Sequence, residues 1–249
     1  MGVTLKLIIR GLYLSLLALM LGCKTQRQPP INIAVATNFY ATALELETAF
    51  EQETGIDISV NSGSTGQLYA QIRNGAPHDI FLAADTVRPQ KLIEDNLAQD
   101  PFTYAIGRLV LWSRFEETPN LEILKQDNYR HLTIANPSLA PYGFAAQEVI
   151  SNLSLFDKIV MGENVGQTFG LVETGNAEFG FVSLAQIISK GSDIKGGYWI
   201  IPDPLYTPII QDAVLLKRGT HKEGAQAFYA FLKSETARDI IKQAGYKLP

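Results

Sequence analysis

Short apolar runs alternate with amphipathic stretches along most of the chain. Ile31–Ala36 is typical of a buried strand, and Tyr40–Gln52 has apolar residues at helical spacing before Gly55, which suits a helix end. Further strands are predicted at Ile56–Val60, Ile80–Ala83, Leu109–Trp112, Leu132–Ala135, Phe179–Val182 and Gln211–Leu216. Further helices are predicted at Gln67–Arg73, Val87–Asn96, Thr118–Asp127, Phe144–Ser151, Gln167–Val172, Leu184–Ser189 and Lys222–Gly245.

The regular alternation of strands and helices predicts parallel sheets covered by helices, since parallel strands need a crossover connection on a sheet face. The pattern changes near residue 107 and then repeats. The sequence therefore predicts an α/β protein with two lobes.

The N-terminal segment has the pattern of an export signal. Lys6 and Arg10 precede an apolar run, Gly11–Leu21, that is too short to cross a bilayer. The residues before Cys23 read Leu-Met-Leu-Gly and resemble a bacterial lipobox, with Met20 where leucine is preferred. We therefore expect a signal peptide at 1–22, lipidation of Cys23 and a polar tether at 23–30; cleavage nearby with an unmodified Cys23 is the alternative.

Composition narrows the classes of function. With 46% hydrophobic and 18% charged residues, the chain is neither disordered, collagen-like nor disulfide-rich. The chain has a net charge of −4, whereas a nucleic-acid binder typically has an excess of Lys and Arg, so no nucleic-acid partner is expected. Loss of residues 1–22 removes two bases and leaves 19 bases against 25 acids, a charge of −6. Net charge would not attract an anionic ligand, so local dipoles would have to bind it.

Polar, small residues open several of the predicted helices. Thr37-Asn38, Ser62–Gly66, Pro141–Gly143 and Asn164–Gly166 all follow predicted strands or begin helices. A helix N-terminus presents unpaired N–H groups and a positive dipole end, and hydroxyls add further donors. In open α/β sheets such junctions gather at the carboxyl ends of strands, where ligands bind. Together they could enclose a tetrahedral oxyanion in neutral donors.

Two other interpretations remain open. Ser, Thr and Asn are the preferred helix N-caps, so any one junction can be purely structural. Asp79 or Asp85 could serve an exported hydrolase, although Ser62–Gly66 lacks the G-x-S-x-G pattern of a nucleophile elbow.

Ten short segments occur in a recognisable order between Ile31 and Pro249: Ala34–Phe39, Ser62–Gly66, Ala70–Ile72, Asn74–Pro77, Asp79–Phe81, Ala83–Asp85, Ala140–Gly143, Asn164–Gln167, Gly180–Val182 and Ala244–Tyr246. In content and order they resemble the ModA family of molybdate-binding proteins from bacterial ABC importers.

The resemblance implies a type II periplasmic-binding-protein fold with its ligand in the cleft between the lobes. Lobe 1 would comprise residues 31–106 and 212–249, and lobe 2 residues 107–211. The chain would bind molybdate or tungstate as a monomeric receptor, with no cofactor, no catalysis and no metal other than that of the oxyanion. Its partner would be a membrane permease, and its location the periplasm, anchored through Cys23.

The resemblance also implies the donor set, carried over by matching position. It comprises Thr37, Asn38, Ser64, Thr65, Tyr142 and the backbone of Val165. Family members often have serine at the position of Thr65, and some have tyrosine at that of Ser183. A receptor for sulfate or phosphate is the alternative within the same class.

Overall fold

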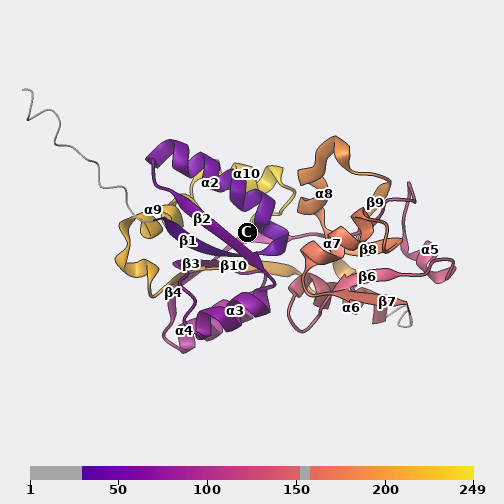
Figure 1. Cartoon of the computed structure of the whole chain (residues 1–249), viewed down its shortest axis with the longest axis horizontal. Helices are drawn as coiled ribbons and strands as arrows, with labels where there is room; N and C mark the ends of the chain where they lie inside the picture. The colour runs from indigo at the N-terminus through magenta and orange to yellow at the C-terminus, as the bar shows by residue number, and fades with distance from the viewer. Residues whose placement is uncertain (1–29, 152–157) are drawn as a thin grey trace, which may run out of the picture.

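Two mixed β-sheets, each covered by helices, lie side by side along the long axis of the molecule (Figure 1). The computed structural model describes residues 30–151 and 158–249. Within these ranges each sheet has five strands. This is the predicted two-lobed α/β architecture. The predicted signal peptide and most of the tether, including Cys23, lie outside the described residues.

The first sheet has the order β2 (Ile58–Gly63), β1 (Ile31–Ala36), β3 (Ile80–Leu82), β10 (Ile209–Leu216) and β4 (Ala98–Gly107). Its strands β2, β1 and β3 are parallel, while β10 runs antiparallel to both β3 and β4. The carboxyl ends of β1 and β2 therefore meet at one edge of the lobe, pointing toward the second sheet.

The second sheet repeats this plan with the order β7 (Ile159–Gly162), β6 (Leu132–Ala135), β8 (Phe179–Ser183), β5 (Leu109–Ser113) and β9 (Gly197–Ile200). Strands β7, β6 and β8 are parallel, and β5 is antiparallel to β8 and β9. The chain passes between the sheets twice, from β4 to β5 at residue 108 and from β9 to β10 over residues 201–208.

Side chains that alternate along the strands bury both faces of the first sheet. Ile33 and Val35 of β1 pack with the helices α2 (Tyr40–Thr54), α9 (Glu223–Phe231) and α10 (Glu235–Gln243). Ala34 packs on the opposite face with α3 (Thr65–Arg73) and α4 (Val87–Glu94).

The other helices in the described ranges are α5 (Leu121–Lys125), α6 (Pro141–Ser151), α7 (Val165–Glu173) and α8 (Leu184–Lys190), with short 3-10 turns η1 (Thr37–Phe39), η2 (Gly191–Asp193), η3 (Asp203–Leu205) and η4 (Gly219–His221).

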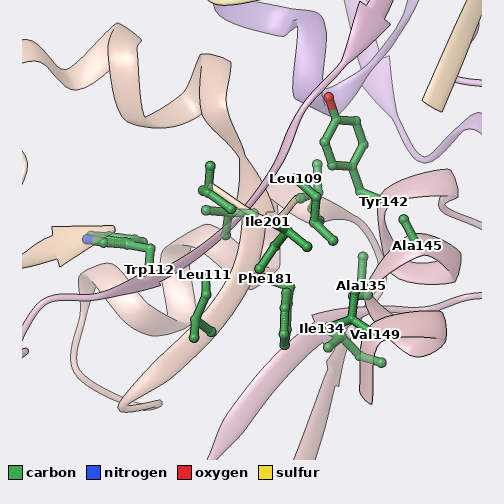
Figure 2. Packing of buried hydrophobic residues seen from close by; sticks show 14 of the residues in the cluster. Leu109, Leu111, Trp112, Ile134, Ala135, Tyr142, Ala145, Val149, Phe181 and Ile201 are labelled. Carbon is green, nitrogen blue, oxygen red and sulfur yellow. The ribbon is translucent and has the colours of Figure 1, made fainter. Parts of the chain in front are cut away.

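The second lobe has one core, formed where α6 and α7 pack against its sheet. Figure 2 shows Leu109, Phe181 and Ile201 at its centre, with Tyr142 at the margin. The ring of Tyr142 belongs to this core, and its hydroxyl points away from the apolar residues shown (Figure 2). A side chain rooted in the second lobe thus presents its polar end toward the first.

Several predicted elements differ from those observed. Strand β4 was not predicted, because Asp100 and Pro101 within it favour a turn; pairing with β10, through two register irregularities, holds it extended. Strands β7 and β9 were also not predicted. The predicted helix Lys222–Gly245 is instead two helices, since the Ser234 hydroxyl caps the backbone N–H of Ala237 at 3.2 Å and starts α10.

Two helices next to the candidate site begin earlier in the sequence than predicted. Helix α3 begins at Thr65 and α6 at Pro141, both earlier than predicted, whereas the helix predicted at Thr118–Asp127 shrinks to α5. Thr65 and Tyr142 therefore lie in the first turns of helices. Over the described ranges, no helix is both long enough and apolar enough to span a membrane.

Candidate functional site

The helix-opening turns of both lobes meet around a small buried cavity of about 10 Å³. All six predicted donor residues line it: Thr37, Asn38, Ser64, Thr65, Tyr142 and Val165. The other lining residues are Ala36, Ala84, Ala140, Pro141 and Asn164. None of these described lining residues carries a charge. The first lobe supplies η1 and the start of α3, and the second supplies the starts of α6 and α7.

Two lining hydroxyls are buried without a partner. Within the described residues, Thr37 Oγ1 and Tyr142 Oη have no hydrogen bond. Buried hydroxyls nearly always find a partner, because leaving one unpaired costs about 1–3 kcal/mol. Two such groups facing one cavity mark it as a place where a ligand completes the hydrogen bonding.

The hydroxyls of the α3 turn already accept one hydrogen bond each. Thr65 Oγ1 accepts from the backbone N–H of Ala84 at 3.1 Å, and Ser64 Oγ accepts from that of Gln67 at 3.3 Å. Gln67 returns the bond to the Ser64 N–H, which completes a capping box. Each hydroxyl proton remains available for donation to an acceptor in the cavity, so capping and ligand binding are compatible here.

The backbone of Val165 lies at the first position of α7. Asn164 caps this helix, its Oδ1 accepting from the N–H groups of Gly166 at 2.9 Å and Gln167 at 3.0 Å. The Val165 N–H is one of the first four amides of the helix and lies outside that cap. The cap thus fixes the turn and leaves the Val165 amide for the cavity.

Asn38 lines the cavity, but its side-chain amide donates hydrogen bonds to buried protein groups that do not line the cavity. Its Nδ2 donates to Gln211 Oε1 at 3.0 Å and to the Tyr246 hydroxyl at 3.1 Å. The Tyr246 hydroxyl donates in turn to the Asn38 carbonyl at 2.8 Å. What Asn38 can offer an anion is therefore its backbone N–H in η1, not its amide side chain.

This network contains residues that the sequence analysis missed. Gln211, Tyr104 and Tyr246 form a second layer around Asn38, and all three are buried. The polar Gln211 in a largely apolar strand was the available signal, since a glutamine buried in a sheet needs partners.

The Tyr142 phenol remains a neutral donor. Burial raises its pKa well above the ordinary value, and the nearby Tyr246 and Tyr206 phenols raise it further; the polar groups of the Gln211 side chain and the Arg108 backbone beside the phenol act in the opposite direction. At neutral pH the hydroxyl therefore carries its proton and can donate it.

Direct contacts close the two lobes over the cavity. The backbone N–H of Gly66 in α3 donates to the Leu139 carbonyl at 2.8 Å. Arg88 in α4 donates to the Ser138 carbonyl at 2.8 Å, and Gln67 Nε2 to Glu163 at 3.4 Å. These bonds join elements of different sheets, so they exist only while the lobes are together.

The two candidate hydrolase carboxylates lie elsewhere. Asp79 is fully buried and is held by Lys222 at 2.6 Å and Arg218 at 3.2 Å. Asp85 pairs with the Arg88 side chain and caps its backbone N–H at 2.9 Å, beside a neighbouring cavity of about 680 Å³. Neither lines the small cavity, and the partners of both fit structural roles.

Known proteins that resemble this chain include extracellular solute-binding proteins. The profile of a family described as bacterial extracellular solute-binding protein matches residues 31–247. The molybdate-binding protein ModA of Azotobacter vinelandii is 42% identical over 237 residues, covering 92% of this chain and 94% of that protein. The chain belongs to the ModA family of bacterial extracellular solute-binding proteins.

Further relatives agree with this membership. ModA of Rhodobacter capsulatus is 42% identical over 86% of each chain. The solved structure of the Azotobacter vinelandii periplasmic molybdate-binding protein superposes with a TM-score of 0.83 at 41% identity, over 88% of this chain and 99% of that one. The ModA-family fold predicted from the sequence is thereby confirmed.

Proposed function

We propose that this ModA-family protein captures molybdate in the periplasm and delivers it to the membrane permease of an ABC importer. The observation that carries the proposal is the buried cavity between the lobes, whose lining residues are uncharged. Thr37 lines it from the first lobe and Tyr142 from the second, and both hydroxyls lack a hydrogen-bond partner among the described residues. The relatives at 42% identity are named molybdate-binding proteins.

The donors of the cavity suit a tetrahedral dianion. Hydroxyls of Thr37, Ser64, Thr65 and Tyr142 and the amide of Val165 would each donate to an oxyanion oxygen, and hydrogen bonds to a charged acceptor are stronger than neutral ones. The starts of α3, α6 and α7 add positive dipole ends. The protein would therefore hold the anion without Lys or Arg.

Selection would rest on size. Sulfate carries the same charge as molybdate but has shorter bonds, so it would leave some of these donors without an acceptor. Each unmet buried donor costs about 1–3 kcal/mol, and several would give strong discrimination. Tungstate matches molybdate in shape and charge, so we propose that it binds as well.

Closure would report occupancy to the permease. The lobes are joined by the two crossings at residue 108 and residues 201–208, and hinge motion at such connections is a common way to enclose a ligand. The bonds from Gly66, Arg88 and Gln67 across the cleft would form when the ligand completes the cavity.

A calorimetric titration of the chain lacking residues 1–23 with molybdate, alone and in excess sulfate, tests this function. We expect one-to-one binding that survives sulfate. Heat from sulfate or phosphate but not from molybdate would favour the alternative receptor. If none of the three anions gave a heat of binding, and the protein hydrolysed ester substrates in a reaction that Asp85→Ala abolishes, the exported hydrolase would be favoured.

We also propose that the mature protein is a monomer held at the membrane by a lipid on Cys23. The lipobox-like residues before Cys23 support the anchor. Sedimentation of the purified protein tests the oligomeric state, and a dimer at micromolar concentration would refute it.

A further inference from the structure

Gln211 lies directly behind the candidate donor Tyr142, at the point where the two lobes meet. It is fully buried in β10 of the first sheet, whereas Tyr142 lies in the first turn of α6 of the second lobe. The side chains of Gln211 and Tyr142 both lie close to Gly107. A methyl group on Gly107 would lie 2.2 Å from Tyr142 Oη and 2.8 Å from Gln211 Nε2. The phenol oxygen and the amide nitrogen therefore both lie against the same side of Gly107, and the Gln211 side chain is close enough to the phenol to influence its pKa.

Hydrogen bonds behind Gln211 decide which way its amide points. The Asn38 carbonyl can only accept, so the Tyr246 hydroxyl at 2.8 Å donates its proton there. The Tyr246 oxygen must then accept from Asn38 Nδ2 at 3.1 Å. The second proton of Asn38 Nδ2 goes to Gln211 at 3.0 Å, which identifies that end of the glutamine as its oxygen.

Tyr104 is compatible with this orientation. Its single hydroxyl proton lies between two acceptors, Gln211 Oε1 at 3.1 Å and the Ala83 carbonyl at 3.0 Å, so the bond from Asn38 Nδ2 is the one that fixes the glutamine. The Gln211 Nε2 is left pointing toward Tyr142. Within the described residues, neither Nε2 nor Tyr142 Oη has another partner of ordinary geometry.

We propose that Gln211 is a positioning residue: its amide N–H donates toward the Tyr142 oxygen and thereby directs the Tyr142 proton to the bound oxyanion. An amide nitrogen cannot accept, so a phenol facing it must turn its own proton elsewhere. The cavity is where that proton finds an acceptor. Because Gln211 lies on β10 of the first sheet, whereas Tyr142 packs with the core of the second sheet, the donor is oriented only when the cleft is closed. This inference rests on the proposed function.

A double-mutant cycle isolates the effect through Tyr142. Gln211→Met keeps the side-chain length and removes both polar atoms. We expect it to weaken molybdate binding by the full-length protein about tenfold, since one oriented bond to a charged acceptor is lost. In a Tyr142→Phe background the same substitution should change affinity less than twofold. Equal losses in both backgrounds would overturn the proposal and leave Gln211 a structural residue.

A second variant reverses the direction of the hydrogen bond. In Gln211→Glu an ionised carboxylate would accept the Tyr142 proton and take it from the ligand, whereas the protonated carboxyl can donate as the amide does. Molybdate affinity of this variant should rise as pH falls from 9 to 6, while the wild type stays nearly flat. The exposed Gln243→Glu is the matched control for the added charge and should follow the wild type.

The outcomes separate the two proposals. If the wild type does not bind molybdate, the proposed function fails. If it binds, but Gln211→Glu and Gln243→Glu show the same pH profile, only the role of Gln211 fails. Circular dichroism checks folding, and if Gln211→Met does not fold, the pH profile of Gln211→Glu decides by itself.

Discussion

Gly166 of α7 and Thr37 of η1 touch across the cleft between the lobes. A methyl group on Gly166 would lie 2.4 Å from the Thr37 γ-methyl carbon, far inside contact distance. Thr37 cannot turn away without moving the hydroxyl that faces the cavity. The absence of a side chain at residue 166 is therefore a condition for the closed arrangement.

Gly166→Ala should hinder closure and weaken molybdate binding by about tenfold or more, measured by calorimetry. Gly170→Ala in the same helix is the matched control, because a methyl group there meets no atom within 4 Å. It should leave affinity unchanged and stabilise the fold by about 0.5–1 kcal/mol, since alanine favours helix. Wild-type affinity in Gly166→Ala would mean that binding does not require this closed state.

Thr65→Val should lower molybdate affinity by tenfold to a hundredfold, about 1.5–3 kcal/mol. The variant removes a donor to the anion and also the acceptor of the Ala84 N–H. Urea unfolding should therefore show a loss of stability as well. Thr65→Ser keeps the hydroxyl and should bind nearly as the wild type does; unchanged affinity in Thr65→Val would remove Thr65 from the donor set.

Stability should fall at alkaline pH because of buried tyrosines. Burial raises the pKa of Tyr104, Tyr142 and Tyr246 well above the ordinary value. Unfolded tyrosines ionise near pH 10, while the folded ones stay neutral. This contribution is thus fully present below about pH 10 and is lost above it as pH rises toward the folded pKa values, at about 1.4 kcal/mol per pH unit for each tyrosine.

Urea unfolding between pH 8 and 11 measures this slope. Tyr104→Phe should make the slope above pH 10 shallower by the share of one group. Tyr198→Phe, at a residue that is 43% exposed, is the control. Equal slopes in both variants would show that the buried phenol ionises in the folded protein.

Asp79→Asn should destabilise the fold without affecting the ligand. The carboxylate is fully buried, whereas Lys222 is partly exposed and Arg218 is half exposed, so the substitution leaves no cation deeply buried. We expect a loss of about 1–3 kcal/mol, because the carboxylate accepts hydrogen bonds from Lys222 and from the Asn32 backbone N–H. Thermal unfolding should show the loss, and molybdate affinity at 15 °C should match the wild type. A stable variant with altered binding would give Asp79 a role in function.

Cys23→Ser should release the protein from the membrane fraction of cells, because the thiol that would receive the lipid is gone. The measurement is fractionation followed by immunoblotting, with Cys23 intact as the reference. A wild-type protein that is already in the soluble fraction would refute lipidation.

The sequence by itself determined the fold class and the composition of the site. Apolar runs such as Ile31–Ala36 specify strands because their side chains must leave water, and Ser, Thr and Asn mark helix starts because they satisfy free backbone amides. Such signals are local, and they mark the helix-opening turns that contain the six residues of the donor set implied by the family resemblance, which the structure places around one cavity.

Only the tertiary structure decided which of those groups already have hydrogen-bond partners within the protein. Strand β4 exists because β10 pairs with it, despite a local sequence that favours a turn. The Asn38 side chain turns inward because Gln211 and Tyr246 reach it from segments 173 and 208 residues away. Hydrogen-bond partners so distant along the chain leave no periodic pattern, so only the folded protein shows which groups are satisfied and which remain free for a ligand.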